Sequence, residues 1–168
     1  MEQAKQNLEV LNVPENIKVL ANILKTNVAA CVSIGPAYYS QLTVIYMDLL
    51  SLYRYVSQLV SQEVATNGRV ATSMPKVRSM RTVKKESLKL IETYVTKAED
   101  LNNIAEHMIP PLLAAVLTDY AQNVEDARDA EVLSVMATVV TRIGVTIFLA
   151  RSKYIYIYFL KQKIPFLC

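Results

Sequence analysis

The feature that most constrains the fold is a long run of helical periodicity in the first half of the chain. Between residues 37 and 66, apolar side chains recur mostly at steps of three and four, the spacing of one helix face. The run covers about eight turns, or roughly 45 Å. It predicts one long helix that begins after Gly35-Pro36 and ends at the turn dipeptide Asn67-Gly68. The apolar residues of this face are Tyr38, Leu42, Ile45, Leu49, Leu52, Val56, Leu59 and Val64.

A second helix is expected before the long one. Asn12, with Glu15 three residues later, is a candidate N-cap for it. Because the link at Gly35-Pro36 is so short, we expect the two helices to lie antiparallel as a hairpin. The apolar face of this helix contains Ile17, Leu20, Ile23 or Leu24, Val28 and Cys31.

The loop 67–75 precedes a third helix, which either Pro75 opens or Ser73 caps. A further helical stretch starts at Asp100 and is interrupted at Pro110-Pro111. Adjacent prolines remove two backbone donors, and the first should push Ile109 out of the α region, so a kink or two short helices are expected. The apolar face of the third helix contains Val77, Met80, Val83 or Lys84, Leu88, Ile91 and Val95.

The last helix is expected to open at Asp126 or Asp129, and its apolar positions run from Val132 to Ile143. Helix pairs then begin near residues 14 and 75 and a fifth helix near 129, a recurrence of roughly 54 to 61 residues. No window before residue 145 shows the alternation of a strand. The pattern predicts an all-α, HEAT-repeat helical solenoid of about two and a half repeats, with a compact five-helix bundle as the alternative.

Charge is unevenly distributed along the chain, although the formal net charge is +3. Residues 1–144 hold 14 basic and 15 acidic side chains, whereas residues 145–168 hold four basic side chains, no acidic one and all three Phe. The basic balance therefore indicates no nucleic-acid partner for the helical body. The uncharged runs 132–141 and 143–150 fall short of the roughly 18 residues of a spanning helix, so we expect no membrane partner.

Residues that could carry chemistry are few. The single histidine, His107, is expected on a helix surface, and Cys31 is expected to be a small core residue. The sequence offers no third group to orient His107 and Cys31 as a base and a thiol nucleophile. It also contains no phosphate-binding glycine loop and no zinc motif. We therefore expect no enzyme, no metal and no cofactor.

One charged feature has a helical geometry. Arg78, Arg81, Lys85 and Lys89 follow one another at steps of three, four and four, so they form a basic ridge on the third helix. Lys76 and Lys84 flank this ridge. It can be a solvated face, a face paired with acids such as Asp119, Glu125 or Asp126, or a contact surface for an acidic protein partner.

Three blocks of the sequence resemble the exportin-1 family, the chromosome region maintenance karyopherins of the importin-beta superfamily. The blocks are LKTNVAACVSIGPAYYSQLTVIYMDLLSLYRYVSQLVSQEVATNG, PKVRSMRTVKKESLKLIETYV and PPLLAAVLTDYAQNVEDARDAEVLSVMATVV. In order and spacing they are similar to the C-terminal HEAT-repeat region of that family, and the resemblance extends from about residue 14 to residue 144. The residues resemble those of fungal members most.

The resemblance implies a non-catalytic scaffold from a ring-shaped receptor that shuttles between nucleus and cytoplasm. Such receptors carry leucine-rich export-signal cargo together with Ran-GTP through nuclear pores, where they contact nucleoporins. The cargo groove and reactive cysteine of the family lie in earlier repeats, so Cys31 is not read as that cysteine. The neighbouring repeats of the same receptor are the remaining implied partners.

The resemblance also divides the chain. Residues 1–13 are expected to form a lead-in helix or fray, and residues 14–144 the HEAT repeats. Residues 145–168 are interpreted as an aberrant hydrophobic basic tail from intron read-through. The alternative interpretations are that the chain is an independent helical adaptor or a non-functional truncated product.

Overall fold

The computed structural model describes residues 13–144, and every element of regular structure in that range is helical. Residues 1–12 and 145–168, which include Asn12 and the tail interpreted as read-through, lie outside the described range. Three short helical turns connect the larger helices, at Gly68–Ser73, Ile104–Met108 and Glu125–Ala127. The helices are α2 (Pro14–Ile34), α3 (Pro36–Asn67), α4 (Pro75–Lys97), α5 (Leu101–Asn103), α6 (Ile109–Gln122) and α7 (Glu131–Ile143).

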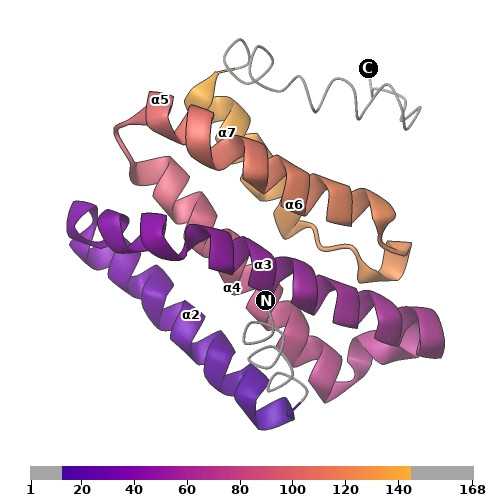
Figure 1. The fold of residues 1–168 in the computed structure, drawn as a ribbon. Helices are drawn as coiled ribbons and strands as arrows, with labels where there is room; N and C mark the ends of the chain where they lie inside the picture. Colours follow the sequence, from indigo (N-terminus) through magenta and orange to yellow (C-terminus); the bar gives the residue numbers. More distant parts are fainter. Residues whose placement is uncertain (1–12, 145–168) are drawn as a thin grey trace.

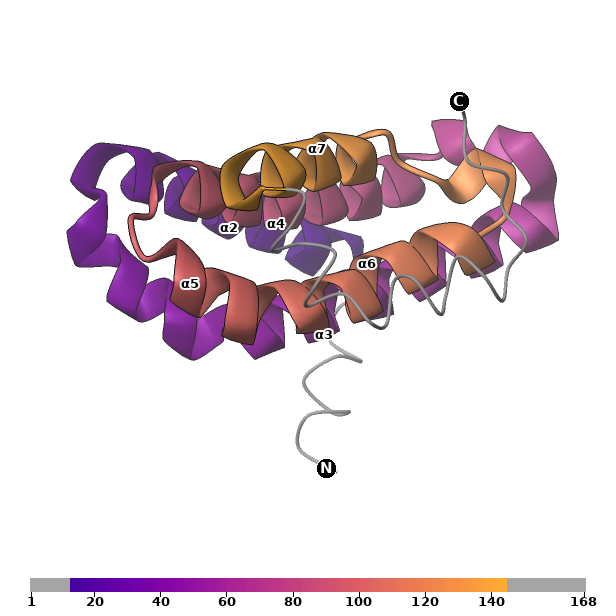
Figure 2. The same cartoon turned by 90° about the horizontal axis from the view of Figure 1, so that it is seen from above.

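The helices form two stacked layers (Figures 1 and 2). One layer contains α2, α4 and α7, with α4 packed between the other two. The second layer contains α3 and the α5–α6 segment. The layers confirm the expected all-α, HEAT-like solenoid.

Contacts at a constant sequence offset show that the helices within each layer run parallel. In the second layer, Tyr46 contacts Met108 and Ser57 contacts Asp119, and both offsets are 62 residues. In the first layer, Lys85 contacts Glu131 and Glu92 contacts Thr138, and both offsets are 46 residues. Antiparallel neighbours would give offsets that change steadily along the helix, so α6 runs parallel to α3 and α7 runs parallel to α4.

The helix pairing differs from the expected hairpin of α2 and α3. These helices meet at Gly35, whose φ of 49° suits glycine, and then diverge (Figure 1). The short link fixes only their adjoining ends, whereas the buried stripe of α2 lies mainly against α4. The last helix, α7, also packs on α4. Helix α3 packs along α4 in antiparallel orientation, since Glu63 contacts Lys76 and Tyr53 lies beside Lys84, and α2 stacks on α4. The α2 stripe consists of Ile17, Ala21, Leu24, Val28 and Cys31.

The double proline lies in a continuous helical path rather than at a sharp break. Ile109 has φ −68° and ψ −45°, so the expectation that it leaves the α region is wrong. The turn before it is a π-helix, in which the Ile109 N–H donates to the Ile104 carbonyl five residues back. The wider turn makes room for the proline rings, as single π turns inside α-helices do. The Tyr46 hydroxyl donates to the Met108 carbonyl at 2.7 Å and ties this turn to α3.

Helix starts agree only in part with the expected caps. Asp100 caps α5, where its Oδ1 accepts from the Asn103 N–H at 3.1 Å. Neither Asp126 nor Asp129 caps α7, whose N-cap is Ala130. Both aspartates contact basic side chains instead. Ser73 does not cap α4, because Met74 is the N-cap residue and Pro75 occupies the first turn.

The buried faces follow the expected stripes with a few exceptions. On α3, Ile45 is 37% exposed, and Tyr46 takes its place in the core. On α2, where either Ile23 or Leu24 was expected in the core, Leu24 is buried and Ile23 is exposed. On α7, Leu133 is exposed. The α4 stripe is buried throughout, and it includes Lys84.

Helix α2 is long and apolar enough to cross a membrane by length and composition, with a mean hydropathy of 1.4 over its most apolar window. Its charged residues exclude it from the uncharged runs on which the sequence-based expectation depended. In this fold 28% of that window is buried, and the apolar stripe of α2 packs against α4; core helices of globular proteins pass the same test of length and composition.

Candidate protein-contact surfaces

The four ridge residues divide into two classes, and the first is engaged in packing. Arg81 donates from Nε to Asp129 Oδ1 at 3.0 Å and from one terminal nitrogen to the Asp126 and Arg128 carbonyls at 2.9 and 3.0 Å. Lys85 lies 2.8 Å from Glu131. The partners belong to α7 and the connector before it, so two ridge residues join one repeat to the next.

Asp129 and Glu131 were not among the acids expected to pair with the ridge. Asp126 contacts Arg81 through its carbonyl, and its carboxylate lies 4.0 Å from Arg69. The Lys85 contact lowers the pKa of the Glu131 carboxyl, chiefly by its hydrogen bond.

Lys84, expected only to flank the ridge, is a core residue. Its side chain is 1% exposed, and its ammonium lies 2.6 Å from Asp129 Oδ2 and 5.5 Å from the centre of the Tyr53 ring. Asp129 Oδ2 makes no well-aligned hydrogen bond, so its contact with Lys84 is ionic. Burial, followed by the nearby Asp119 and Asp129 carboxylates, raises the pKa of Tyr53.

Arg78 and Lys89 form the second class of ridge residue. Both are exposed, and neither forms an ion pair within residues 13–144. Thr82 shares their helix face and, with Ser79, lines a cavity of about 270 Å³ between α4 and α2. Two lysines of α2 line the same cavity. We name Lys18, Lys25, Arg78 and Lys89 the basic face.

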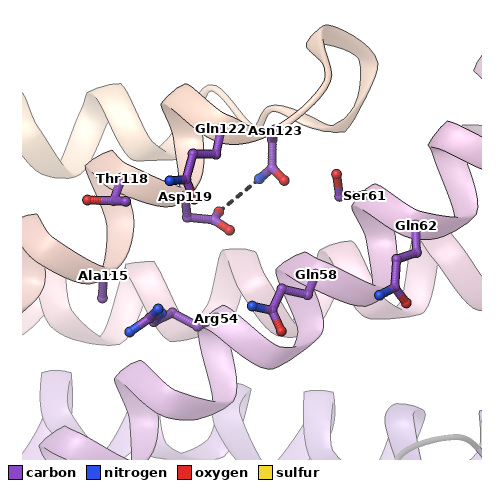
Figure 3. Close-up of a pocket in the computed structure, with 9 residues that line it drawn as sticks. All are labelled: Arg54, Gln58, Ser61, Gln62, Ala115, Thr118, Asp119, Gln122 and Asn123. Carbon is purple, nitrogen blue, oxygen red and sulfur yellow. Dashed lines mark hydrogen bonds between the residues drawn. The ribbon is translucent and has the colours of Figure 1, made fainter. Parts of the chain in front are cut away.

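A second surface lies between α3 and α6, where a cavity of about 450 Å³ opens to solvent (Figure 3). We name it the polar groove. Eight of its nine lining residues are polar or charged, and they come from two parallel helices of one layer and the residue that follows α6. The α3 wall consists of Arg54, Gln58, Ser61 and Gln62, and the opposite wall of Ala115, Thr118, Asp119, Gln122 and Asn123.

Hydrogen bonds fix the α6 wall of the polar groove. Asp119 Oδ2 accepts from the Ser57 hydroxyl at 2.6 Å, from the Asn123 side-chain amide at 2.9 Å and from the Tyr53 hydroxyl at 3.3 Å. The Asn123 amide also donates to Ser57 Oγ at 3.0 Å. These groups are partly or fully buried, so the wall is held in one arrangement.

The remaining candidates behave as packing or surface residues. Cys31 is fully buried, and this burial raises the pKa of its thiol. His107 is exposed, with Nδ1 3.3 Å from the Asn103 carbonyl. Within the described part of the chain, no three His, Cys, Asp or Glu side chains are grouped as a metal site requires.

The polar groove was not predicted from the sequence. Its signal was the recurrence of Arg54, Gln58 and Gln62 every four residues on a helix, on the face opposite to apolar positions. The facing α6 wall could not be aligned with this row from sequence, because the register of the two helices depends on the intervening connections.

Comparison with known proteins identifies relatives across most of the chain. The family model described as CRM1 C terminal matches residues 41–166. Exportin-1 of Schizosaccharomyces pombe is 53% identical over 142 residues, which are 84% of this chain and 13% of that protein. Protein EXPORTIN 1B of Arabidopsis thaliana is 43% identical over 140 residues (83% and 13%), and Exportin-1 of Drosophila melanogaster 40% over 142 residues (84% and 13%).

The chain thus spans about an eighth of the length of these relatives. The family-model match continues past residue 144, where the sequence resemblance ended, to residue 166. The interpretation of residues 145–168 as foreign stays a prediction, and this match does not favour it. Both walls of the polar groove and all four ridge residues lie within the matched range.

Proposed function

The chain belongs to the exportin-1 family of nuclear export receptors, and on that premise we propose that it forms a structural segment of such a receptor's helical scaffold. In this role its residues hold neighbouring HEAT repeats at a fixed spacing and orientation. It binds rather than catalyses. The full receptor, by family resemblance, takes leucine-rich export-signal cargo with Ran-GTP, contacts nucleoporins and shuttles between nucleus and cytoplasm.

The observation that carries this proposal is the polar seam between α4 and α7. Besides the Arg81 and Lys85 contacts, Glu92 Oε1 accepts from the Ser134 and Thr138 hydroxyls at 2.9 and 2.8 Å. At the far end, Arg142 donates to the carbonyls of Val95 and Ala98, which end α4. Polar pairs distributed along the whole contact fix its register, as a scaffold of stacked repeats requires.

The basic face extends the proposal to a partner. Four exposed cations on α2 and α4, with the ion-paired Lys85 beside them, give this surface an excess of positive charge. Such a surface attracts an acidic protein surface or an acidic segment of the same receptor. We infer that Arg78 and Lys89, rather than Arg81 and Lys85, supply the charges for that contact.

The test of the scaffold role is a segment exchange. The matching 142-residue stretch of Schizosaccharomyces pombe exportin-1 is replaced by the aligned residues of this chain, and nuclear export of a reporter with a leucine-rich signal is followed in fission yeast. We expect export to be retained. A chimaera that accumulates to normal levels but leaves the reporter in the nucleus would contradict the proposal.

The isolated chain provides a complementary test. Because the family's cargo groove lies in other repeats, we expect no saturable binding of a leucine-rich export peptide, with or without Ran-GTP. Submicromolar binding by the chain alone would show that it is an independent receptor module rather than a scaffold segment.

A further inference from the structure

Three side chains on one wall of the polar groove are spaced to meet an extended peptide. Arg54, Gln58 and Gln62 follow one another every four residues along α3 (Figure 3). Four residues of α-helix rise about 6 Å, and two residues of extended chain advance about 6.6 to 6.8 Å. Over the two steps from Arg54 to Gln62 the mismatch is about 1.5 Å, which flexible side chains can absorb. The row can therefore contact every second residue of a strand.

The chemistry of the groove suits a peptide backbone. A glutamine carboxamide offers both a donor and an acceptor, as does each peptide unit of an extended chain. Gln58 and Gln62 lie on the α3 wall, and Gln122 and Thr118 lie on the α6 wall (Figure 3). Hydrogen bonds to both edges of a bound backbone are thus available from the two walls.

Hydrogen bonds order the α6 wall of the polar groove before any ligand binds. The Ser57, Asp119 and Asn123 contacts hold the α6 wall in place, so binding has less ordering to impose on it. Small-molecule sites are lined mostly by apolar side chains, whereas Ala115 is the one apolar residue that lines this groove. A segment recognised through its main chain fits these walls better than a compact molecule.

Arg54 adds a charge preference at one end of the row. It is exposed and forms no ion pair within the described residues. Its guanidinium can bind a carboxylate with two parallel hydrogen bonds. An acidic side chain of the ligand is therefore expected beside Arg54.

We propose that the polar groove between α3 and α6 binds an extended peptide segment, with an acidic residue beside Arg54 and its main-chain amides held by Gln58, Gln62 and Gln122. This interaction goes beyond the scaffold role and does not depend on it. A negative result at the groove would leave the segment exchange unaffected, and the reverse also holds.

The experiment measures fluorescence anisotropy with the full chain and two dye-labelled octapeptides of alternating Ser and Thr. One carries a single Glu near its N-terminus and the other near its C-terminus, since the groove accepts either chain direction. We expect saturable binding of one of them, with Kd on the order of 100 μM. Exchange of its Glu for Ser weakens binding several-fold, and Arg54→Glu shifts the preference to a Lys-containing version.

Two comparisons isolate main-chain recognition. The double variant Gln58→Leu/Gln62→Leu is expected to weaken binding at least tenfold, whereas Gln41→Leu, at an exposed α3 position outside the groove, leaves it unchanged. N-methylation of alternate peptide nitrogens should weaken binding in either phase, because each phase removes the N–H donors of one backbone edge and the two walls contact both edges. The proposal is overturned if neither peptide binds, if the double variant binds normally with unchanged circular dichroism, or if N-methylation weakens binding in neither phase.

Discussion

The ammonium group of Lys84, on α4, lies 2.6 Å from Oδ2 of Asp129, on the connector that leads into α7, and the lysine side chain is only 1% exposed. Arg81 holds the other oxygen of the same carboxylate at 3.0 Å. One acidic side chain thus neutralises a buried cation and fixes the start of the next repeat. Removal of one member of a buried pair leaves an uncompensated charge, which costs far more than the pair contributes.

Lys84→Met is therefore expected to lower the free energy of unfolding by about 3 kcal/mol, near the lower end for buried pairs because Arg81 still contacts Asp129. The measurement is urea denaturation followed by circular dichroism. Lys89→Met, on the same helix but exposed, is the matched control and should change the free energy by less than about 0.5 kcal/mol. Addition of Asp129→Leu to Lys84→Met should recover part of the loss, and a further additive loss would contradict the pairing.

Ser57→Ala tests the hydrogen bonds that hold the α6 wall. The Ser57 hydroxyl donates to Asp119 and accepts from Asn123, and the residue is fully buried. Its loss leaves buried groups of two partners short of a hydrogen bond, so we expect destabilisation of about 1 to 3 kcal/mol in the same denaturation assay. Ser51→Ala, whose hydroxyl donates to the Met47 carbonyl of its own helix at the surface, should stay near zero. Equal effects of the two variants would contradict this role.

The sequence allowed much of the fold to be predicted, because helical periodicity depends on local spacing. The extents of α3 and α4 and the burial of Cys31 follow from stripes and turn residues alone. The partner of each stripe could not be predicted in this way. Packing between helices far apart in sequence decided that α2 lies against α4.

The candidate surfaces were predictable only in part, for the same reason. The spacing that defined the ridge is correct, yet it could not separate Arg81 and Lys85, which face α7, from Arg78 and Lys89. Lys84 carried a readable signal, since it occupies a position of the apolar stripe where a lysine needs a buried partner. The identity of that partner, Asp129, depends on the connector after α6.

Glu131→Gln tests the Lys85 contact through its pH dependence. Because this contact lowers the pKa of the Glu131 carboxyl in the folded chain below its ordinary value, the pair stabilises the fold above that ordinary pKa and loses its effect as the pH falls through the folded pKa. Thermal midpoints measured between acidic and neutral pH should show the variant less stable near neutrality. The gap to the wild type should close in acid, and a gap that stays constant would exclude an ionic contribution.

Charge reversal on the ridge separates its structural from its exposed members. Arg81→Glu places a carboxylate beside Asp129 and removes donors from two connector carbonyls, so we expect a loss of about 3 kcal/mol or more in urea denaturation. Arg78→Glu/Lys89→Glu alters only side chains without an ion pair in the described residues, and its unfolding free energy should stay within about 0.5 kcal/mol for each substitution.

The double variant should instead weaken salt-dependent binding of a poly-glutamate probe to the full chain, because two of the four cations of the basic face are reversed. Arg69→Glu/Lys97→Glu, at two exposed positions outside the basic face, is the control with the same change in net charge. If the double variant and the control reduce probe binding equally, net charge rather than the basic face attracts the probe. A double variant as unstable as Arg81→Glu would show that Arg78 and Lys89 also belong to the packing between repeats.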